Sequence, residues 1–185
     1  EPYYSHGLDN ILKQFTYKLT GIVNGIDYDV YNPETDPMIF KNFDVNSLDI
    51  KAFNKAELQK QMGLPQKADT PIVGIVTRLV KHKGIDLVKC VFEELLNADV
   101  QFAILGSGEW EFETFFHDMA QKYPEKVAFK KGFIPQLAHK IYAGADIFLM
   151  PSISEPCGLS QMIASRYATV PVVRETGGLY DSIKP

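Results

Sequence analysis

The amino-acid sequence predicts an α/β fold, a single domain in which helices flank a parallel sheet. Between residues 70 and 175, short apolar segments alternate with longer amphipathic segments. Strands and helices that alternate in this way form βαβ units, whose strands run parallel. The strand segments are apolar almost throughout, as expected when helices cover both faces of a sheet. The expected architecture is therefore Rossmann-like.

Apolar runs place the strands of this regular part, and helical periodicity places its helices. We expect strands over residues 71–79, 100–106, 127–133, 146–152 and 170–175. We expect helices over residues 84–97, 109–123, 135–145 and 159–168. The sequence does not open with Met, and it stops just beyond a Gly-Gly turn, where we expect no closing helix. We therefore take the chain for a piece of a longer protein.

The part of the chain before residue 70 is less regular. It predicts a helix over 7–19, a short strand over 20–27 that ends in an Asn-Gly turn, a polar surface loop over 28–53 and a short helix over 54–63. In the last of these, Asn54 is the expected N-cap and Gly63 the expected C-cap. With the segment 20–27, the expected strands number six.

The composition of the 185 residues narrows the possible functions. A net charge of −4 argues against a general nucleic-acid binder, which would carry a basic excess. No apolar run reaches the roughly 20 residues of a membrane span, and no signal peptide opens the chain. We therefore expect a cytoplasmic protein without a membrane partner. Two cysteines are too few for a disulfide framework, and Cys90 is expected to pack within its apolar helix.

Ligands of open parallel sheets bind beyond the carboxyl ends of the strands, so the loops that follow the strands are the informative ones. "TRLVKHKG" brings Arg78 and Lys83 to one such loop, just before a helix. The two cations can converge on an anion, helped by the exposed N–H groups of the helix. A solvated basic turn is the alternative interpretation.

Two further loops are rich in glycine. "GSGEW" contains Gly106 and Gly108 but lacks the third glycine of a dinucleotide fingerprint, so it indicates at most a close turn near a ribose or base. "RETGGL" contains Gly177 and Gly178, whose backbone N–H groups could approach a phosphate closely. A plain turn explains each of these pairs equally well.

Glu155, in "PSISEPCGLS", is an unusual residue for a strand-to-helix turn. It either caps the following helix or accepts hydrogen bonds from sugar hydroxyls, beside the backbone N–H groups of Cys157, Gly158 and Leu159. Several strand ends thus offer groups for phosphate, and this one offers an acceptor for hydroxyls. In combination they predict a pocket for a sugar joined to a diphosphate.

The sequence predicts no metal site. Asp27 and Asp29 form a D-x-D look-alike early in the chain, which we interpret as a structural turn. The histidines, at positions 6, 82, 117 and 139, show no metal-ligand spacing, and Cys157 has no histidine nearby in the sequence.

Five segments of the sequence resemble one enzyme family. "GIVNGIDYDVYNPETD", "VGIVTRLVKHKGIDLV", "ILGSGEWEFE", "GADIFLMPSISEPCGLSQMIA" and "VVRETGGLYDSI" are similar to bacterial glycogen synthases and plant starch synthases. The resemblance is collinear along nearly the whole chain, and "EPCGL" with "TGGL" and the upstream R-x4-K is highly specific. It implies a retaining glycosyltransferase of the two-domain GT-B type. Such an enzyme transfers glucose from ADP-glucose to the non-reducing end of an α-1,4-glucan, without a cofactor.

The resemblance also implies catalytic residues. Arg78 and Lys83 match the pair that holds the donor diphosphate and stabilises the leaving group. Glu155 matches the acidic residue that opens the E-x7-E element of the family and contacts the transferred glucose. Ile163 occupies the second position of that element, so this chain does not keep the strict pattern, which bacterial synthases commonly vary.

Binding residues follow from the same resemblance. Cys157 and Gly158 match a turn whose backbone faces the sugar, and Thr176, Gly177 and Gly178 match a loop that contacts phosphate.

Two positions outside these loops complete the implied site. Asn24 matches an interdomain asparagine near the donor, and Phe133 falls where the family often has an aromatic residue, commonly Tyr, that stacks on adenine. The N-terminal domain of the family supplies the acceptor groove and carries a Lys-x-Gly-Gly-Leu motif. That motif does not occur here. We therefore expect residues 1–20 to be an interdomain remnant and residues 21–185 to be the C-terminal nucleotide-sugar-binding domain, truncated at its own C-terminus.

Two alternatives stay open at this point. Another retaining GT-B transferase, such as a sucrose synthase or a mannosyltransferase, shares E-x7-E and R-x4-K, although "EPCGL" is less usual in those enzymes. A non-catalytic module that binds a nucleotide sugar is the second alternative. A comparison of ADP, UDP and GDP binding would distinguish these transferases from a glucan synthase. A site that binds ADP without any contribution from the sugar would favour the non-catalytic module.

Overall fold

The structure of the chain is a computed structural model that describes residue 5 and residues 7–184. His6 lies outside the described residues. The helices are α1 (Asp9–Gln14), α2 (Ile50–Met62), α3 (Ile85–Leu95), α4 (Trp110–Lys122), α5 (Pro135–Gly144), α6 (Ser160–Arg166) and α7 (Gly177–Ser182), with 3-10 turns η1 (Thr16–Lys18) and η2 (Lys81–Lys83). The strands are β1 (Ile72–Leu79), β2 (Gln101–Gly108), β3 (Val127–Lys131), β4 (Ile147–Met150) and β5 (Val170–Val173).

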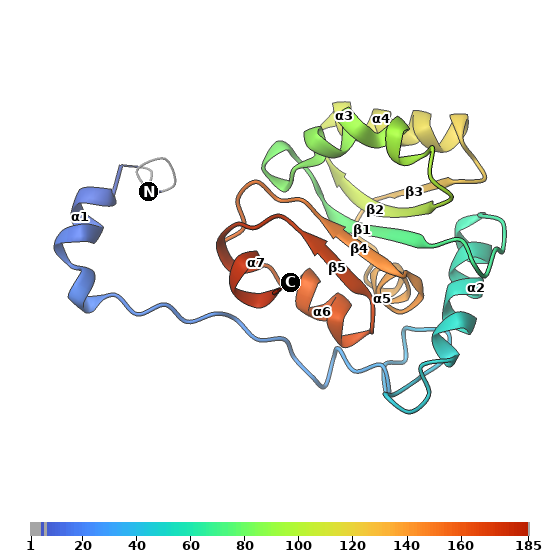
Figure 1. The fold of residues 1–185 in the computed structure, drawn as a ribbon, viewed down its shortest axis with the longest axis horizontal. Coiled ribbons are helices and arrows are strands. Elements are labelled where there is room, and N and C mark those ends of the chain that lie inside the picture. The colour runs from blue at the N-terminus through green and yellow to red at the C-terminus, as the bar shows by residue number, and fades with distance from the viewer. Residues whose placement is uncertain (1–4, 6, 185) are drawn as a thin grey trace.

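These strands form one parallel sheet of five strands in the order β3-β2-β1-β4-β5. Figure 1 shows α3 and α4 on one face of the sheet and α2, α5 and α6 on the other. Alternate residues of β1 point to opposite faces, so Ile75 packs under α3 and α4 while Ile72 joins the core on the α5 side. The predicted α/β fold with helices on both faces of a parallel sheet is confirmed.

The segment before the sheet differs from the prediction. Residues 20–27 form no strand but an extended, largely exposed segment, and Ile22 is 88% exposed there. Figure 1 shows this segment leading from α1, which stands away from the sheet, toward the rest of the domain. The prediction of a sixth strand is wrong because the apolar residues of this segment find no neighbouring strand to pair with.

Three local predictions also need correction. The helix expected from Asn54 begins at Ile50, and the buried amide of Asn54 instead bonds both backbone groups of Lys41, which fixes the preceding loop. Gly63 ends that helix in the left-handed conformation, as expected. We expected a Gly-Gly turn with no helix after it, but α7 begins at Gly177. Cys90 is exposed rather than packed.

One edge of the sheet is open in this structure. β5 pairs with β4 on one side, and its outward-facing residues Val170 and Val172 are 63% and 48% exposed. Pro171 lies between them. Within the described residues, no helix is both long and apolar enough to cross a membrane.

Candidate functional site

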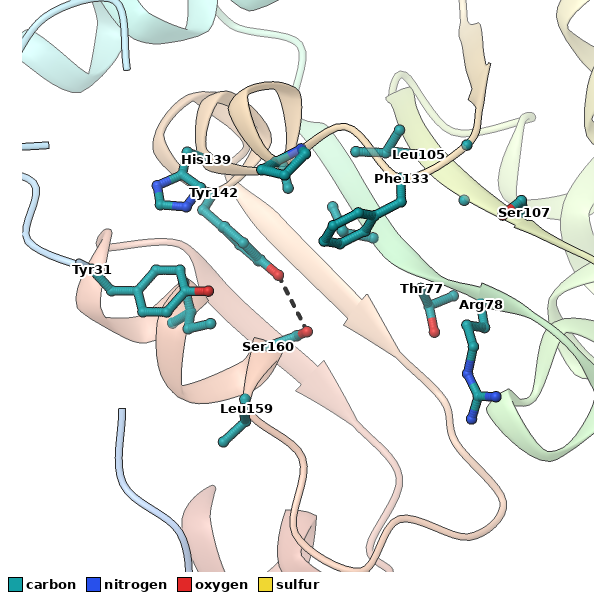
Figure 2. Close-up of a pocket in the computed structure, with 16 residues that line it drawn as sticks. Tyr31, Thr77, Arg78, Leu105, Ser107, Phe133, His139, Tyr142, Leu159 and Ser160 are labelled. Carbon is teal, nitrogen blue, oxygen red and sulfur yellow. Dashed lines mark hydrogen bonds between the residues drawn. The ribbon is translucent and has the colours of Figure 1, made fainter. Parts of the chain in front are cut away.

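A pocket of about 330 Å³ opens at the carboxyl end of the sheet, and we name it the nucleotide pocket after the ligand that the sequence predicts there. It lies between the ends of β1 and β2, the 132–135 segment, α5 and α6 (Figure 2). Four predicted site residues line it: Arg78, Gly106, Phe133 and Leu159. The sheet therefore brings together residues from four loops, as its parallel topology predicts.

The walls of the nucleotide pocket are mainly apolar. Phe133 stands at its mouth with 87% of its surface exposed, and Figure 2 shows its ring directed over the opening. On the opposite side the Tyr142 hydroxyl donates a hydrogen bond to Ser160 Oγ at 3.2 Å. Burial raises the pKa of Tyr142 to about 12, so this phenol stays a neutral donor at physiological pH. An exposed aromatic ring above an apolar slot suits a flat heterocycle.

A second pocket, more polar and more open, lies beside the loop that follows β4. Glu155, Thr176 and Gly177 line it, together with Ser154, Pro156, Glu175 and Tyr180. We name it the carboxylate pocket. The predicted site residues that line a pocket are thus divided between two, one lined by Arg78 and Phe133 and the other by Glu155.

Lys83 and Glu155 form an ion pair, with 2.5 Å between Lys83 Nζ and Glu155 Oε2. Their side chains are only 16% and 9% exposed, and Ser152 Oγ donates a second hydrogen bond to the same carboxylate oxygen at 3.1 Å. Glu155 does not cap the next helix, because α6 starts at Ser160 without a side-chain cap. The ion pair and the Ser152 hydrogen bond thus fix the orientation of this carboxylate, and the helix-cap interpretation is wrong.

Arg78 lies apart from this ion pair. It is exposed, and its closest polar contact is His82 Nε2, 3.5 Å from Arg78 Nη2. The guanidinium is therefore available to an anion at the rim of the nucleotide pocket, whereas the ammonium of Lys83 already has a counter-ion. The expected convergence of Arg78 and Lys83 on one anion would need Lys83 to divide its contacts between that anion and Glu155.

Gly177 and Gly178 hold two loops together. A Cβ on Gly177 would lie 2.2 Å from Glu155 O, and one on Gly178 would lie 2.3 Å from Cys157 Cα. The Gly178 N–H donates to Glu155 O at 3.0 Å, and Thr176 Oγ1 donates to Ile153 O at 3.3 Å. The glycines are thus required for close packing, and the Gly178 amide, which we expected to face a phosphate, is engaged with Glu155.

Gly106 and Gly108 are likewise required for close packing. Added Cβ atoms would lie 2.2 Å from Thr77 O and 2.3 Å from Leu79 O, so only glycine lets β2 run this close to β1. Asn24 is exposed on the extended segment and lines neither pocket.

Gln161 supports the Cys157–Gly158 turn and was not predicted. Its buried Nε2 donates to Cys157 O and Gly158 O and also contacts Ser182 Oγ of α7. Gly158 has a φ of +74°, and a Cβ there would lie 2.6 Å from Gln161 Oε1. Nothing in the sequence distinguishes this glutamine from an ordinary helix residue.

A buried polar cluster supports the nucleotide pocket from behind. His139 Nδ1 lies 2.6 Å from Asp36 Oδ2, and the Tyr167 hydroxyl donates to the same oxygen at 2.5 Å. Tyr31 stacks on the His139 ring with centroids 5.0 Å apart, and both rings line the pocket. Burial and the Asp36 hydrogen bond raise the pKa of Tyr167. The loop around Asp36 is therefore an integral part of the site.

The described residues contain no group of three or more His, Cys, Asp or Glu side chains that could hold a metal ion. Asp27 Oδ1 accepts hydrogen bonds from the N–H groups of Asp29 and Val30, which is the turn predicted for this D-x-D segment.

Comparison with known proteins identifies relatives. The family model described as "Glycosyl transferases group 1" matches residues 56–185. A glycogen synthase of Anoxybacillus flavithermus is 55% identical over 183 residues, which is 99% of this chain and 38% of that protein. A glycogen synthase of Bacillus cereus is 56% identical over 182 residues, which is 98% of this chain and 38% of that protein. The chain thus spans well under half the length of these relatives.

A solved structure agrees with these relatives. The catalytic domain of starch synthase IV from Arabidopsis thaliana, bound to ADP and acarbose, superposes with a TM-score of 0.89 at 40% identity and covers 97% of this chain and 37% of its own. The architecture is that of the C-terminal domain of GT-B glycosyltransferases. Because the matching family model covers well over half of the chain, including every strand of the sheet, the chain belongs to the group 1 family of glycosyl transferases.

Proposed function

We propose that this chain is the donor-binding, C-terminal domain of a glycogen or starch synthase that transfers glucose from ADP-glucose to an α-1,4-glucan with retention. The observation that carries the proposal is that an aromatic-capped pocket and a buried carboxylate, Glu155, lie at the same end of the sheet. Identity of 55% to a glycogen synthase over 99% of the chain supports it.

In this proposal the adenine stacks on Phe133 and the diphosphate extends toward Arg78 and Lys83. The glucosyl unit then reaches the carboxylate pocket, where Glu155 and the turn at Cys157 and Gly158 contact its hydroxyls. The starch synthase IV structure with ADP and acarbose supports a nucleoside diphosphate and a sugar analogue as ligands of such a fold.

Catalysis would be mainly electrostatic. As the bond to the diphosphate breaks, the anomeric carbon becomes positively charged and the departing phosphate becomes more negative. Arg78 and Lys83 would stabilise that negative charge as it develops, and the loss of one such contact costs on the order of 2–4 kcal/mol of barrier. Because Lys83 already contacts Glu155, the same ammonium would link the leaving group to the carboxylate beside the sugar.

The acceptor glucan needs a part of the protein beyond this chain. We assign residues 21–185 to the donor-binding domain and residues 1–20 to a segment that contacts the rest of the enzyme. The exposed apolar side chains of α1 and its flanks support this assignment, since Leu8, Ile11 and Phe15 have no core to pack into here. Without the acceptor domain nothing orients a glucan hydroxyl on the anomeric carbon, so the chain alone should not turn over.

Calorimetry with ADP, ADP-glucose, UDP and GDP, together with an assay of ADP release in the presence of glycogen, tests the proposal. We expect weak binding of ADP, tighter than that of UDP or GDP, and no glycogen-dependent ADP release from the chain alone. Arg78→Ala should weaken ADP binding. Absence of ADP binding at millimolar nucleotide would refute the donor pocket, and glycogen-dependent release of ADP would refute the division of labour between domains.

A further inference from the structure

A groove separate from both pockets is lined by residues of α4 and of β3. Figure 1 shows β3 beside α4, and β3 is an edge strand of the sheet. The groove has a volume of about 300 Å³. Trp110, Glu113, Thr114 and His117 line one side, and Phe129 and Lys131 line the other. The four helical residues follow the i, i+3, i+4, i+7 spacing of one helix face, and the two strand residues share one face of β3. The groove therefore runs along two turns of α4, a length of roughly 10 Å.

Trp110 is the only tryptophan of the chain, and 79% of its surface is exposed. The core does not need it, because Phe112 and Phe116 on the other face of α4 are almost completely buried. The indole N–H of Trp110 donates no hydrogen bond within the described part of the chain. A large flat apolar surface with a spare donor at its edge is thus left facing the groove.

The two charged side chains of the groove, Glu113 and Lys131, have opposite charges and pair with each other. Lys131 Nζ lies 2.5 Å from Glu113 Oε2, and the other carboxylate oxygen of Glu113 accepts the Gly108 N–H at 2.9 Å. The hydrogen bond of Lys131 and the Gly108 N–H lower the pKa of Glu113, so it remains ionised at neutral pH. A paired carboxylate and ammonium attract neither anions nor cations strongly, but both still hydrogen-bond neutral hydroxyl groups. His117 and Thr114 add further hydrogen-bonding capacity along the same face.

We propose that this groove binds an α-1,4-glucan chain, at a site distinct from the nucleotide and carboxylate pockets. A pyranose ring has apolar C–H faces and a rim of hydroxyls, which matches an exposed indole bordered by charge-balanced polar groups. The choice of an α-glucan over another neutral sugar rests on the proposed function. A protein partner would be expected to use a broader apolar surface, and a nucleic acid would need a positive excess that this groove lacks.

The groove lies next in sequence to residues of the nucleotide pocket, which suggests a function for it. Lys131 lines the groove, and the next two residues, Gly132 and Phe133, line the nucleotide pocket. A glucan held on Trp110 is therefore tethered at the same end of the sheet as the donor. Tethering a polymer near a reaction site raises the effective concentration of its chain ends there, without any contact to the reacting atoms.

The emission of the single tryptophan provides a direct test. Titration of the 185-residue chain with maltoheptaose should shift Trp110 emission to the blue and protect it from iodide quenching, because the sugar displaces water from the indole. Cellohexaose, which has the same rings in β-linkage, should have little effect. Saturating ADP should not displace maltoheptaose. An unchanged spectrum with maltoheptaose, or competition by ADP, would overturn the glucan groove.

Variants measured by affinity electrophoresis in glycogen-containing gels extend the test. Trp110→Ala should weaken retardation by about tenfold, or roughly 1.4 kcal/mol, whereas Trp110→Phe should keep part of it. Tyr17→Ala, which removes an aromatic residue of comparable exposure (76%), serves as the matched control and should bind as the parent does. Equal retardation of Trp110→Ala and the parent would refute the site.

The two proposals fail in distinguishable ways. ADP binding without any response to maltoheptaose leaves the donor-binding function standing and removes the groove. A response to maltoheptaose without ADP binding supports the groove and removes the donor-binding function.

Discussion

Lys83 Nζ lies 2.5 Å from Glu155 Oε2, so the cation expected to act on the phosphate and the carboxylate expected to act on the sugar hold each other in place. The pair joins the turn after β1 to the loop after β4, 72 residues apart in the sequence. Two groups with separate predicted roles are therefore one structural unit.

Breaking this pair on one side should cost more than removing it altogether. In Lys83→Met or Glu155→Gln alone, the remaining side chain is left largely buried without its counter-ion, at a cost on the order of 3–5 kcal/mol in the free energy of unfolding. The double variant should lose less than the sum of the two. Urea unfolding of the four proteins measures the coupling. Additive single effects would show that the pair contributes nothing as a unit.

Stability should rise with pH between about 7 and 9 through Lys51. Burial of its ammonium among Tyr142 O, Ala143 O, Tyr167 O and Thr169 Oγ1 lowers the pKa of Lys51 to about 7, against the opposing effect of Asp146.

The sign follows from proton counting. Above pH 7 the folded chain releases this proton while the unfolded chain keeps it up to about 10.4, so the unfolded state binds more protons and the free energy of unfolding increases with pH. Below pH 7 both states are protonated and the contribution is constant. Urea midpoints at pH 6, 7, 8 and 9 provide the measurement. A variant without the amine, Lys51→Met, should lose the rise, and an identical slope in this variant would contradict the assignment.

Asp36→Ala should destabilise the domain and disturb the nucleotide pocket together. It removes the common acceptor of His139 and Tyr167, and leaves both buried groups without their partner. Each orphaned group costs roughly 1–3 kcal/mol. Thermal unfolding would measure the loss of stability. A weaker ADP affinity, measured by calorimetry, would indicate that Tyr31 and His139 no longer line the pocket as before. Asp36→Asn keeps one acceptor and should lie between the parent and Asp36→Ala; an Ala variant as stable as the parent would argue against a structural role.

Phe133→Ala should weaken ADP binding and leave stability unchanged. The ring is 87% exposed, so the fold gains little from it, whereas stacking of a base on an aromatic ring contributes roughly 1–3 kcal/mol. Phe133→Tyr should bind at least as well as the parent. Calorimetry with ADP and thermal unfolding on the same samples separate the two effects. Unaltered ADP affinity in Phe133→Ala would place the adenine elsewhere.

Gly178→Ala should lower stability, because its methyl group would overlap the backbone of Cys157, which belongs to a loop that cannot easily move. A forced contact of this kind costs typically 1–3 kcal/mol. Gly21→Ala is the matched control, since a Cβ there meets nothing within 4 Å. Urea unfolding of both variants compares them. Equal effects would show that the contact between the 155–157 and 176–178 loops is adaptable.

The sheet could be predicted because each strand is a continuous apolar run between turn residues, and that pattern depends only on neighbours in the sequence. The same rule failed at 20–27, where apolar residues such as Ile22 have no sheet to join. Gly177 and Gly178 indicated a turn because glycine disfavours helices, yet their close packing on the neighbouring loop starts α7 there.

The site was predictable to the extent that parallel strands deliver their loops to one edge. Arg78 and Glu155 were singled out in this way, and each lines a pocket at that end of the sheet. Phe133 was singled out by the family resemblance. The cluster of Asp36 with His139 could not be, because its members lie 103 residues apart and only packing brings them together. The resemblance to glycogen synthases, carried by "EPCGL" and "TGGL", located residues but did not indicate that Lys83 and Glu155 pair.

Pro171 lies on the side of β5 that has no partner strand in this structure. Because the Val170 N–H bonds Asp146 O toward β4, the nitrogen of the next residue faces the open side of β5, and proline has no hydrogen to offer there. The row of donors that would recruit a foreign strand is interrupted at its centre, between two exposed valines. Replacing Pro171 with a residue of higher strand propensity would restore an N–H donor at this position. We expect the resulting chain to aggregate and precipitate during storage.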